Sequence, residues 1–124
     1  MAALFARASY RGAGPDDPGV KGSAAVQEIL EGIVRRYDDG TPRTQHVTTN
    51  LMIDVDDSTN ATARSCFTVL QQVEPGSINT IIAGRYQDTF ARDDEGWYLT
   101  ERVILTSLVG DLSKHLTVDP FSLD

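Results

Sequence analysis

One stretch of the chain, from Ala24 to Arg36, carries the hydrophobic spacing of an amphipathic helix. This spacing places its apolar residues on one face of a helix, where they can pack against a core. Ser23 comes just before and is a good N-cap residue, and the Gly- and Pro-containing run from Tyr37 to Pro42 ends the helix. The apolar residues of the stretch are Ala25, Val26, Ile29, Leu30, Ile33 and Val34.

The chain beyond Pro42 has the composition and punctuation of β-strands. We predict four strands, at Arg43 to Val55, Ala61 to Val73, Ser77 to Arg92 and Trp97 to Leu108. Short turns rich in Asp, Asn, Pro and Gly join them, and strands connected so closely form an antiparallel meander. Each predicted strand is long, which implies strong twist and curvature of the sheet.

The N-terminal part is predicted to contribute little regular structure. Met1 to Ala6 is expected to form a short helix, and Ser9 to Gly22 a loop, because the loop carries several glycines and prolines. A curved antiparallel sheet with one or two helices on its concave side is an α+β roll. The predicted fold class is therefore α+β, in a single domain that covers residues 1–124.

Two polar residues interrupt the predicted strands. His46 lies in the first strand and Arg102 in the fourth, among residues typical of buried strand. Burying an unpaired polar group costs roughly 2–7 kcal/mol, and an unpaired charge costs more. The two side chains therefore either point to water or line a cavity that uses them.

Strict alternation along the strands sorts side chains onto two faces of the sheet, unless a β-bulge shifts it. The even face of the first strand includes His46, and its odd face is largely apolar. One short helix cannot cover that odd face, and a wide exposed apolar patch is rare on monomers. We therefore expect a homo-oligomer, a dimer or trimer, joined partly through the outer sheet face. The odd face holds Val47, Thr49, Leu51, Ile53 and Val55, and one face of the fourth strand holds Tyr98, Thr100, Arg102, Ile104 and Thr106.

Composition excludes several classes of function. The net charge is −7 and Lys and Arg form no stripe, which argues against a nucleic-acid partner. Cys66 is the single cysteine, so an internal disulfide or a cysteine metal cluster is excluded, and a reducing compartment is indicated. No apolar run approaches the roughly 20 residues needed to span a bilayer. We expect a cytoplasmic protein that uses no metal or other cofactor.

Four segments, in their order and spacing, resemble the SnoaL-like branch of the nuclear transport factor 2-like superfamily. They are Thr44 to Asn50, Ala61 to Val69, Gly84 to Asp88 and Asp94 to Val103. That branch includes scytalone dehydratase, hexachlorocyclohexane dehydrochlorinase, polyketide cyclases and the small subunits of ring-hydroxylating dioxygenases. The resemblance implies a cone-shaped, cystatin-like roll, with helices packed into a curved antiparallel sheet around a deep, mostly apolar pocket.

The resemblance also implies site residues. In the lyases of the branch a strand histidine is the general base, and His46 matches it. Arg102 matches an arginine that lies in the pocket near the leaving group. By the same correspondence six residues resemble pocket lining for a small apolar or ring-containing molecule: Thr44, Phe67, Val69, Ile82, Tyr86 and Thr106.

One departure from the family pattern affects the expected activity. The aspartate that orients the histidine in these lyases lies on a helix that precedes the segment resembling Met1 to Phe5, so the domain looks N-terminally shortened. Asp16 and Asp17 lie at a different place in the pattern and are not expected to substitute. Without an orienting carboxylate, we expect catalysis by His46 to be weak or absent.

The remaining chemistry-bearing residues have simpler interpretations. Cys66 is expected to be an inert buried thiol, and His115 a surface residue of the C-terminal tail. The acidic run from Asp93 to Glu95 lacks the alternating ligands of a calcium loop and is expected to be a solvated turn. Tyr86 is either core filler or a hydrogen-bond donor to a ligand.

Two questions stay open at the sequence level. Arg102 could instead pair with Asp88, or with Glu101 of another subunit. Three functions are compatible with the chain: a cofactor-independent lyase or isomerase that uses His46 as base, a non-catalytic pocket for a small apolar ligand, and an assembly module that resembles a dioxygenase small subunit.

Overall fold

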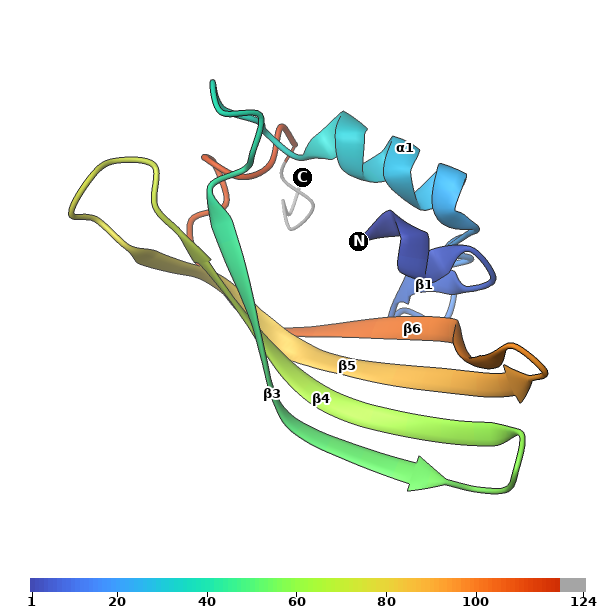
Figure 1. The fold of residues 1–124 in the computed structure, drawn as a ribbon. Helices are drawn as coiled ribbons and strands as arrows, with labels where there is room; N and C mark the ends of the chain where they lie inside the picture. Colours follow the sequence, from blue (N-terminus) through green and yellow to red (C-terminus); the bar gives the residue numbers. More distant parts are fainter. Residues whose placement is uncertain (119–124) are drawn as a thin grey trace.

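A single curved sheet forms the body of the molecule, and one α-helix lies on its concave side (Figure 1). The computed structural model describes residues 1–118. The sheet order is β2-β1-β6-β5-β4-β3, antiparallel throughout except for the parallel pair of β1 and β6. The α+β prediction is confirmed. The elements are η1 (Ala2–Phe5, a 3-10 helix), β1 (Ser9–Gly12), β2 (Val20–Lys21), α1 (Ser23–Ile33), β3 (Thr44–Val55), β4 (Asn60–Gln71), β5 (Asn79–Asp93) and β6 (Gly96–Val109).

The four-strand meander is present, with bounds within two residues of those predicted. Side chains in the turns explain why the chain reverses where it does. At the β3–β4 turn the Asp57 carboxylate accepts the backbone N–H groups of Thr59 and Asn60, at 2.7 and 2.8 Å. At the β5–β6 turn Gly96 has φ 114°, a left-handed conformation that glycine adopts without a Cβ clash. These local turn signals made the meander predictable.

The prediction of a loop from Ser9 to Gly22 is wrong, because this segment contributes β1 and β2. β1 runs parallel to β6 and pairs Tyr10 with Arg102, so it covers backbone groups that would otherwise form the open edge of the sheet. The glycines and prolines belong to the turn between the two short strands, where Asp17 accepts the N–H groups of Gly12 and Gly19, both at 2.8 Å. A partner so distant along the chain leaves no local signature.

Helix α1 forms where the apolar spacing predicts it, but both of its ends differ. Gly22, with φ 93°, occupies the N-cap and no side chain caps the helix, so the assignment of Ser23 as N-cap is wrong. The helix ends at Ile33, three residues before the predicted end. Val34 is already extended there and bridges to Leu116, and the Arg35 N–H donates to the His115 carbonyl at 2.7 Å. The backbone after Ile33 therefore pairs with the C-terminal segment.

A β-bulge changes which way the second half of β3 faces. The register jumps between Thr49 and Met52, and Asn50 within the jump has φ 55°. Before the jump His46 shares a face with Val69; after it Ile53 and Val55 share that same face, opposite Ala63 and Ala61. The odd positions of this strand therefore do not share one face: Val47 and Thr49 lie on the outer face, and Ile53 and Val55 lie on the inner face.

A second irregularity, between Thr89 and Phe90, likewise separates two residues predicted to share a face. Leu99 lies opposite Phe90, which puts Tyr98 on the other face from Arg102. The remaining alternation holds, since Arg102 and Ile104 lie opposite Asp88 and Tyr86.

We call the concave side of the sheet the inner face; on β4 it carries six buried residues, Ala61, Ala63, Ser65, Phe67, Val69 and Gln71. Two groups of residues cover parts of it. Near β6, Phe5 and Val26 of η1 and α1 pack with Leu99. Near the start of β3, residues 110–118, which we call the C-terminal segment, place Leu112 on Phe67, Val69 and Ile81. No helix among residues 1–118 is long and apolar enough to cross a membrane.

Candidate functional site

All eight residues predicted for the site lie on the inner face. The register connects them across the strands: His46 is opposite Val69, which is opposite Ile82, and Phe67 is opposite Gly84, which is opposite Thr106. The others follow from the same pairing, with Thr44 opposite Gln71, Tyr86 opposite Ser65, and Arg102 opposite Asp88. Strand pairing alone thus gathers them on one surface, although they come from four strands.

The Arg102 guanidinium is held by Asp88 on the neighbouring strand. Arg102 Nε and Nη2 donate to the two oxygens of the Asp88 carboxylate at 2.8 and 2.9 Å, and Asp88 is only 5% exposed. Burial acts to lower the pKa of Arg102, but the bonded carboxylate more than offsets this and the pKa is raised. Of the two ion pairs considered from the sequence, the one with Asp88 forms. A bidentate pair fixes the plane of the guanidinium as well as its place.

Two aromatic rings stack in the middle of the inner face. Phe67 and Tyr86 have centroids 4.6 Å apart and an interplanar angle of 18°. Gly84 makes the room, because a Cβ there would lie 2.9 Å from Phe67 Cε1. Above the other ring, Arg102 Cζ lies 4.0 Å from the Tyr86 centroid, a cation–π contact. Tyr86 is half-buried, and burial raises the pKa of its hydroxyl.

Tyr10 belongs to the same group and was missed from the sequence. It pairs with Arg102 through the β1–β6 register and packs edge-on against Phe5, with centroids 5.1 Å apart. Burial, with a smaller contribution from nearby Tyr86, raises the pKa of Tyr10 to about 12. The phenol is therefore a neutral hydrogen-bond donor at any physiological pH. The segment reads as loop without its β6 partner, so no sequence signal marked it.

His46 lies at the other end of the inner face, near the start of β3. Its side chain is exposed at the sheet edge, and partial desolvation lowers its pKa. None of the hydrogen bonds among residues 1–118 joins its ring to a carboxylate, and no carboxylate contributes to its pKa shift. The imidazole is consequently neutral at neutral pH and competent as a proton acceptor.

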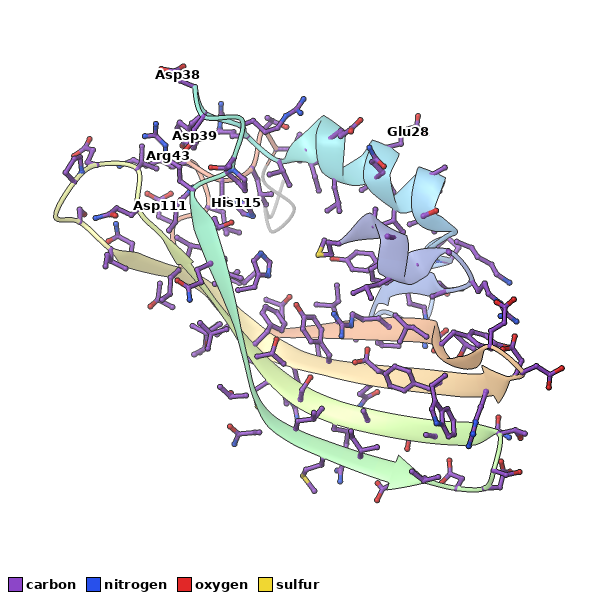
Figure 2. All side chains as sticks on the ribbon, in the orientation of Figure 1. Glu28, Asp38, Asp39, Arg43, Asp111 and His115 are labelled. Carbon is purple, nitrogen blue, oxygen red and sulfur yellow. The ribbon has the colours of Figure 1, made fainter. Side chains whose placement is uncertain are left out.

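His115 is the second residue that sequence reasoning misplaced. It is half-buried rather than a surface tail residue, and its Nδ1 is sealed from solvent without a hydrogen-bond partner among residues 1–118. Burial lowers the pKa of His115, and the nearby His46 lowers it further. The C-terminal segment reaches this place by backbone pairing with the residues after α1, a contact 80 residues apart that no local pattern reveals. Figure 2 labels His115, Arg43 and Asp111 at the same end of the molecule.

The inner face therefore carries two polar centres rather than one. His46 lies directly opposite Val69 of β4. Arg102 and Asp88 are instead level with Ala63, which is six residues away from Val69 along β4. At about 3.3 Å per residue this is roughly 20 Å along an uncurved strand. The stacked Phe67 and Tyr86 lie between the two centres.

Two grooves flank this surface. One of about 620 Å³ runs along the starts of β3 and β5, between Arg43 and Ile78, and Thr44 is the predicted site residue that lines it. The other, of about 510 Å³, lies between Arg35 and the C-terminal segment. Two other candidates have structural roles: Asp17 shapes its turn, and Asp93 pairs with Arg7 at 2.7 Å. Cys66 is half-buried on the outer face and not buried as expected.

A curved sheet wrapped around one helix, with a polar and aromatic concave face, defines an α+β protein of the cystatin-like type. Residues 1–103 match the family described as a SnoaL-like domain, and the chain belongs to that family. No match was found among curated proteins.

Solved structures agree with this assignment. A structure from Novosphingobium aromaticivorans described as a "putative scytalone dehydratase" is 28% identical, with TM-score 0.63 over 89% of this chain and 70% of the other. Two more distant structures share the fold. LinA is 18% identical, with TM-score 0.65 over 97% of this chain and 79% of its own. A protein from Catenulispora acidiphila in complex with S-DNPA is 22% identical, with TM-score 0.60 over 85% of this chain and 75% of its own.

Proposed function

We propose that the inner face binds a small, largely apolar molecule that contains a ring. The observation that carries this proposal is the Phe67–Tyr86 stack, bordered by the partly buried Ile82 and Ile104. A flat apolar ring can extend such a stack, since offset aromatic pairs gain about 0.5–1.5 kcal/mol beyond the area they bury. A structural relative in this fold was solved with a small ligand, S-DNPA, which supports the same use of the fold.

Polar groups beside the stack would fix the orientation of the ring. Tyr10 and Tyr86 remain protonated because burial raises both pKa values, so both hydroxyls can donate to an oxygen of the ligand. Asp88 engages Nε and Nη2 of Arg102, which leaves Nη1 to face an electron-rich substituent. An apolar surface with a few placed donors is the usual design of a small-molecule site.

The chemistry that this site supports is proton abstraction without a cofactor. His46 would take a proton from a carbon of the bound molecule. Arg102, in the other polar centre, would bind an electron-rich substituent at the far end of the ligand and not the reacting group. The resulting reaction class is that of a lyase or isomerase. The similarity to a structure described as a "putative scytalone dehydratase" supports this class.

The second candidate is ligand binding without turnover. It is favoured by one observation: burial, and no carboxylate, accounts for the pKa shift of His46. A general base normally relies on a partner that fixes its tautomer and orientation. Under this alternative the domain carries a ligand or assembles with other chains in the cytoplasm, as a homo-oligomer or as a small subunit.

Calorimetric titration with 2-naphthol tests the binding proposal. We expect Phe67→Ala to weaken binding about tenfold, the loss of one aromatic contact worth about 1.4 kcal/mol. Thr68→Ala, the next residue along β4 but on the outer face, is the matched control and should bind like the unmodified protein. Equal affinity of all three proteins, or no binding at all, would contradict the proposal.

Exchange of the C–H protons of a bound probe with solvent distinguishes catalysis from ligand binding without turnover. A ketone-bearing bicyclic probe, 2-tetralone, exchanges its acidic C–H protons with D₂O when a base abstracts them. An exchange rate above the buffer rate that falls to it in His46→Gln supports the lyase or isomerase class. Binding of the probe without faster exchange supports the non-catalytic alternative.

A further inference from the structure

The two edges of the sheet differ in how they are protected against pairing with another chain. One edge is β2, which is two residues long and carries Lys21, and short edge strands and lysines are both common protections. The other edge is β3, which is twelve residues long and contains no Lys, Arg or Pro. The bulge around Asn50 divides this strand, so the stretch from Leu51 to Val55 is a separate, unbroken piece of open edge.

The backbone of this stretch presents free hydrogen-bonding groups at the edge. The Asp56 N–H donates to the Asn60 carbonyl of β4 at 2.9 Å, which marks residue 56 as a position bonded to β4. Hydrogen-bonded positions alternate with non-bonded positions along an antiparallel pair of strands. Asp54 therefore also bonds to β4, whereas Ile53 and Val55 direct their N–H and C=O groups away from it. Among residues 1–118, no strand pairs with that side of β3.

The side chains of the same stretch are apolar on both faces of the sheet. Met52 lies opposite Arg64 on the outer face, whereas Ile53 and Val55 lie on the inner face. All three apolar side chains, and that of Leu51 beside the bulge, are more than half exposed. A long edge with exposed apolar side chains and free backbone groups is a template for another strand. This stretch therefore favours β-pairing with a second chain.

We propose that residues 51–55 of β3 pair with the same residues of a second copy, antiparallel and around a two-fold axis at Ile53. The bulge bounds the stretch on one side, and the turn that begins at Asp56 bounds it on the other. Ile53 is the middle residue, so the ends of the two stretches coincide when the copies pair about it. Each Ile53 then exchanges its N–H and C=O with Ile53 of the other copy, and Val55 lies opposite Leu51. The same surface is used on both copies, as in any two-fold interface.

Charge favours a second copy in this register. The chain has a net charge of −7, but Asp54 is the single charged residue of the stretch, so two copies can approach here with little repulsion. Pairing about Ile53 places Asp54 opposite Met52 of the second copy. Sliding the copies by two residues would either set the two Asp54 carboxylates opposite each other, which is destabilising, or bring the bulge into the pair. At each end of the proposed pair, the Asn50 amide of one copy lies beside the Asp56 carboxylate of the other, a donor beside an acceptor.

The pairing also enlarges the inner face. Ile53 lies opposite Ala63, which is level with Asp88 and Arg102 on the next strands. A two-fold axis perpendicular to the sheet keeps both inner faces on the same side, so the two Arg102 centres share one continuous surface in the dimer. No ligand takes part in the pairing, so its test is independent of the proposed function.

Disulfide trapping tests the register in a Cys66→Ala background, which removes the single cysteine of the chain. Directly opposite residues of an antiparallel pair have Cα atoms about 4.5–5.5 Å apart, within the range of a disulfide. In Ile53→Cys the two new thiols face each other across the axis, so we expect a disulfide-linked dimer. Val55→Cys is the matched control, because Val55 is exposed to a similar extent on the same face. The thiols of its two copies would lie about four residues apart along the strands, roughly 13 Å, which is too far to bond.

With oxidised glutathione and micromolar protein, we expect Ile53→Cys to form the linked dimer about tenfold faster than Val55→Cys, as measured on non-reducing gels. Equal rates in the two variants, or no linked dimer in Ile53→Cys, would overturn the proposal. Sedimentation of the unmodified chain needs no variant and should give twice 13.5 kDa. A mass of 13.5 kDa would leave this edge to a segment of a different protein and would also overturn the pairing.

Discussion

Two parts of the inner face differ in whether helices pack on them, and this difference changes how exposed their apolar side chains are. Near β6, Phe5, Val26 and Leu99 lie under η1 and α1 and are 0%, 1% and 8% exposed. On the far half of β3, Ile53 and Val55 belong to the same face but are 59% and 66% exposed. The residues are equally apolar, so the difference arises from what packs on them and not from their chemistry. The covered part stabilises the fold, and the open part leaves a surface for another molecule.

Matched truncations in the two parts give the largest expected contrast. Phe5→Ala should lower the free energy of unfolding by about 3–5 kcal/mol, because it removes a fully buried ring and leaves a cavity. Val55→Ala removes methyl groups that already contact water and should cost less than about 0.5 kcal/mol. Urea denaturation followed by circular dichroism measures both. Similar losses in the two variants would show that the open part is covered in solution.

Breaking a half-buried and an exposed ion pair should give the same kind of contrast, with smaller losses of stability. Asp88→Ala leaves the half-buried Arg102 without its partner and should cost about 2 kcal/mol, below the 3–5 kcal/mol of fully buried pairs because Arg102 keeps 21% of its side chain exposed. Asp93→Ala breaks the exposed pair with Arg7 and should cost less than about 1 kcal/mol. Denaturation at low and high salt distinguishes them, since salt screens the exposed pair more strongly.

Acid should weaken the fold through the two histidines. Both have pKa values lowered in the folded state, so between those values and the unfolded value of about 6.5 the unfolded chain binds more protons. The free energy of unfolding should therefore fall as the pH drops below about 7. His115→Gln should flatten this slope. An identical slope in the variant would show that His115 is not desolvated in the folded protein.

The state of assembly is the next way to sharpen the comparison. The bulge at Asn50 turns Ile53 and Val55 inward, so the expectation of contact through the outer face loses part of its basis. We still predict a dimer or trimer, now with the open half of β3 at the contact. Light scattering should give twice or three times 13.5 kDa for the unmodified chain and a smaller mass for Ile53→Lys. A mass of 13.5 kDa at micromolar concentration would contradict this.

The sequence predicted those features of the fold that local residue patterns encode. The spacing around Val26 and Ile29 marked the helix, and the turn residues around Asp57 and Gly96 marked the strands. The family resemblance then supplied His46 and Tyr86 as site candidates. Those residues needed only correct strands and register to reach the inner face.

What the sequence concealed depends on contacts between distant parts of the chain. β1 forms only because β6 offers a free edge, so Tyr10 looked like a loop residue. The C-terminal segment returns to the backbone after α1, so His115 looked like a tail residue. The bulge at Asn50 was anticipated as a type of irregularity, but no residue pattern fixed its position.

A chemical-shift map with 2-naphthol tests most directly whether the inner face is a small-molecule site. In a protein labelled on its aromatic and backbone groups, we expect the largest shifts at Phe67, Tyr86 and Ile104, with smaller ones at His46. Arg64 and Arg85 on the outer face should stay unchanged. Shifts confined to the outer face, or spread evenly over both faces, would contradict the account.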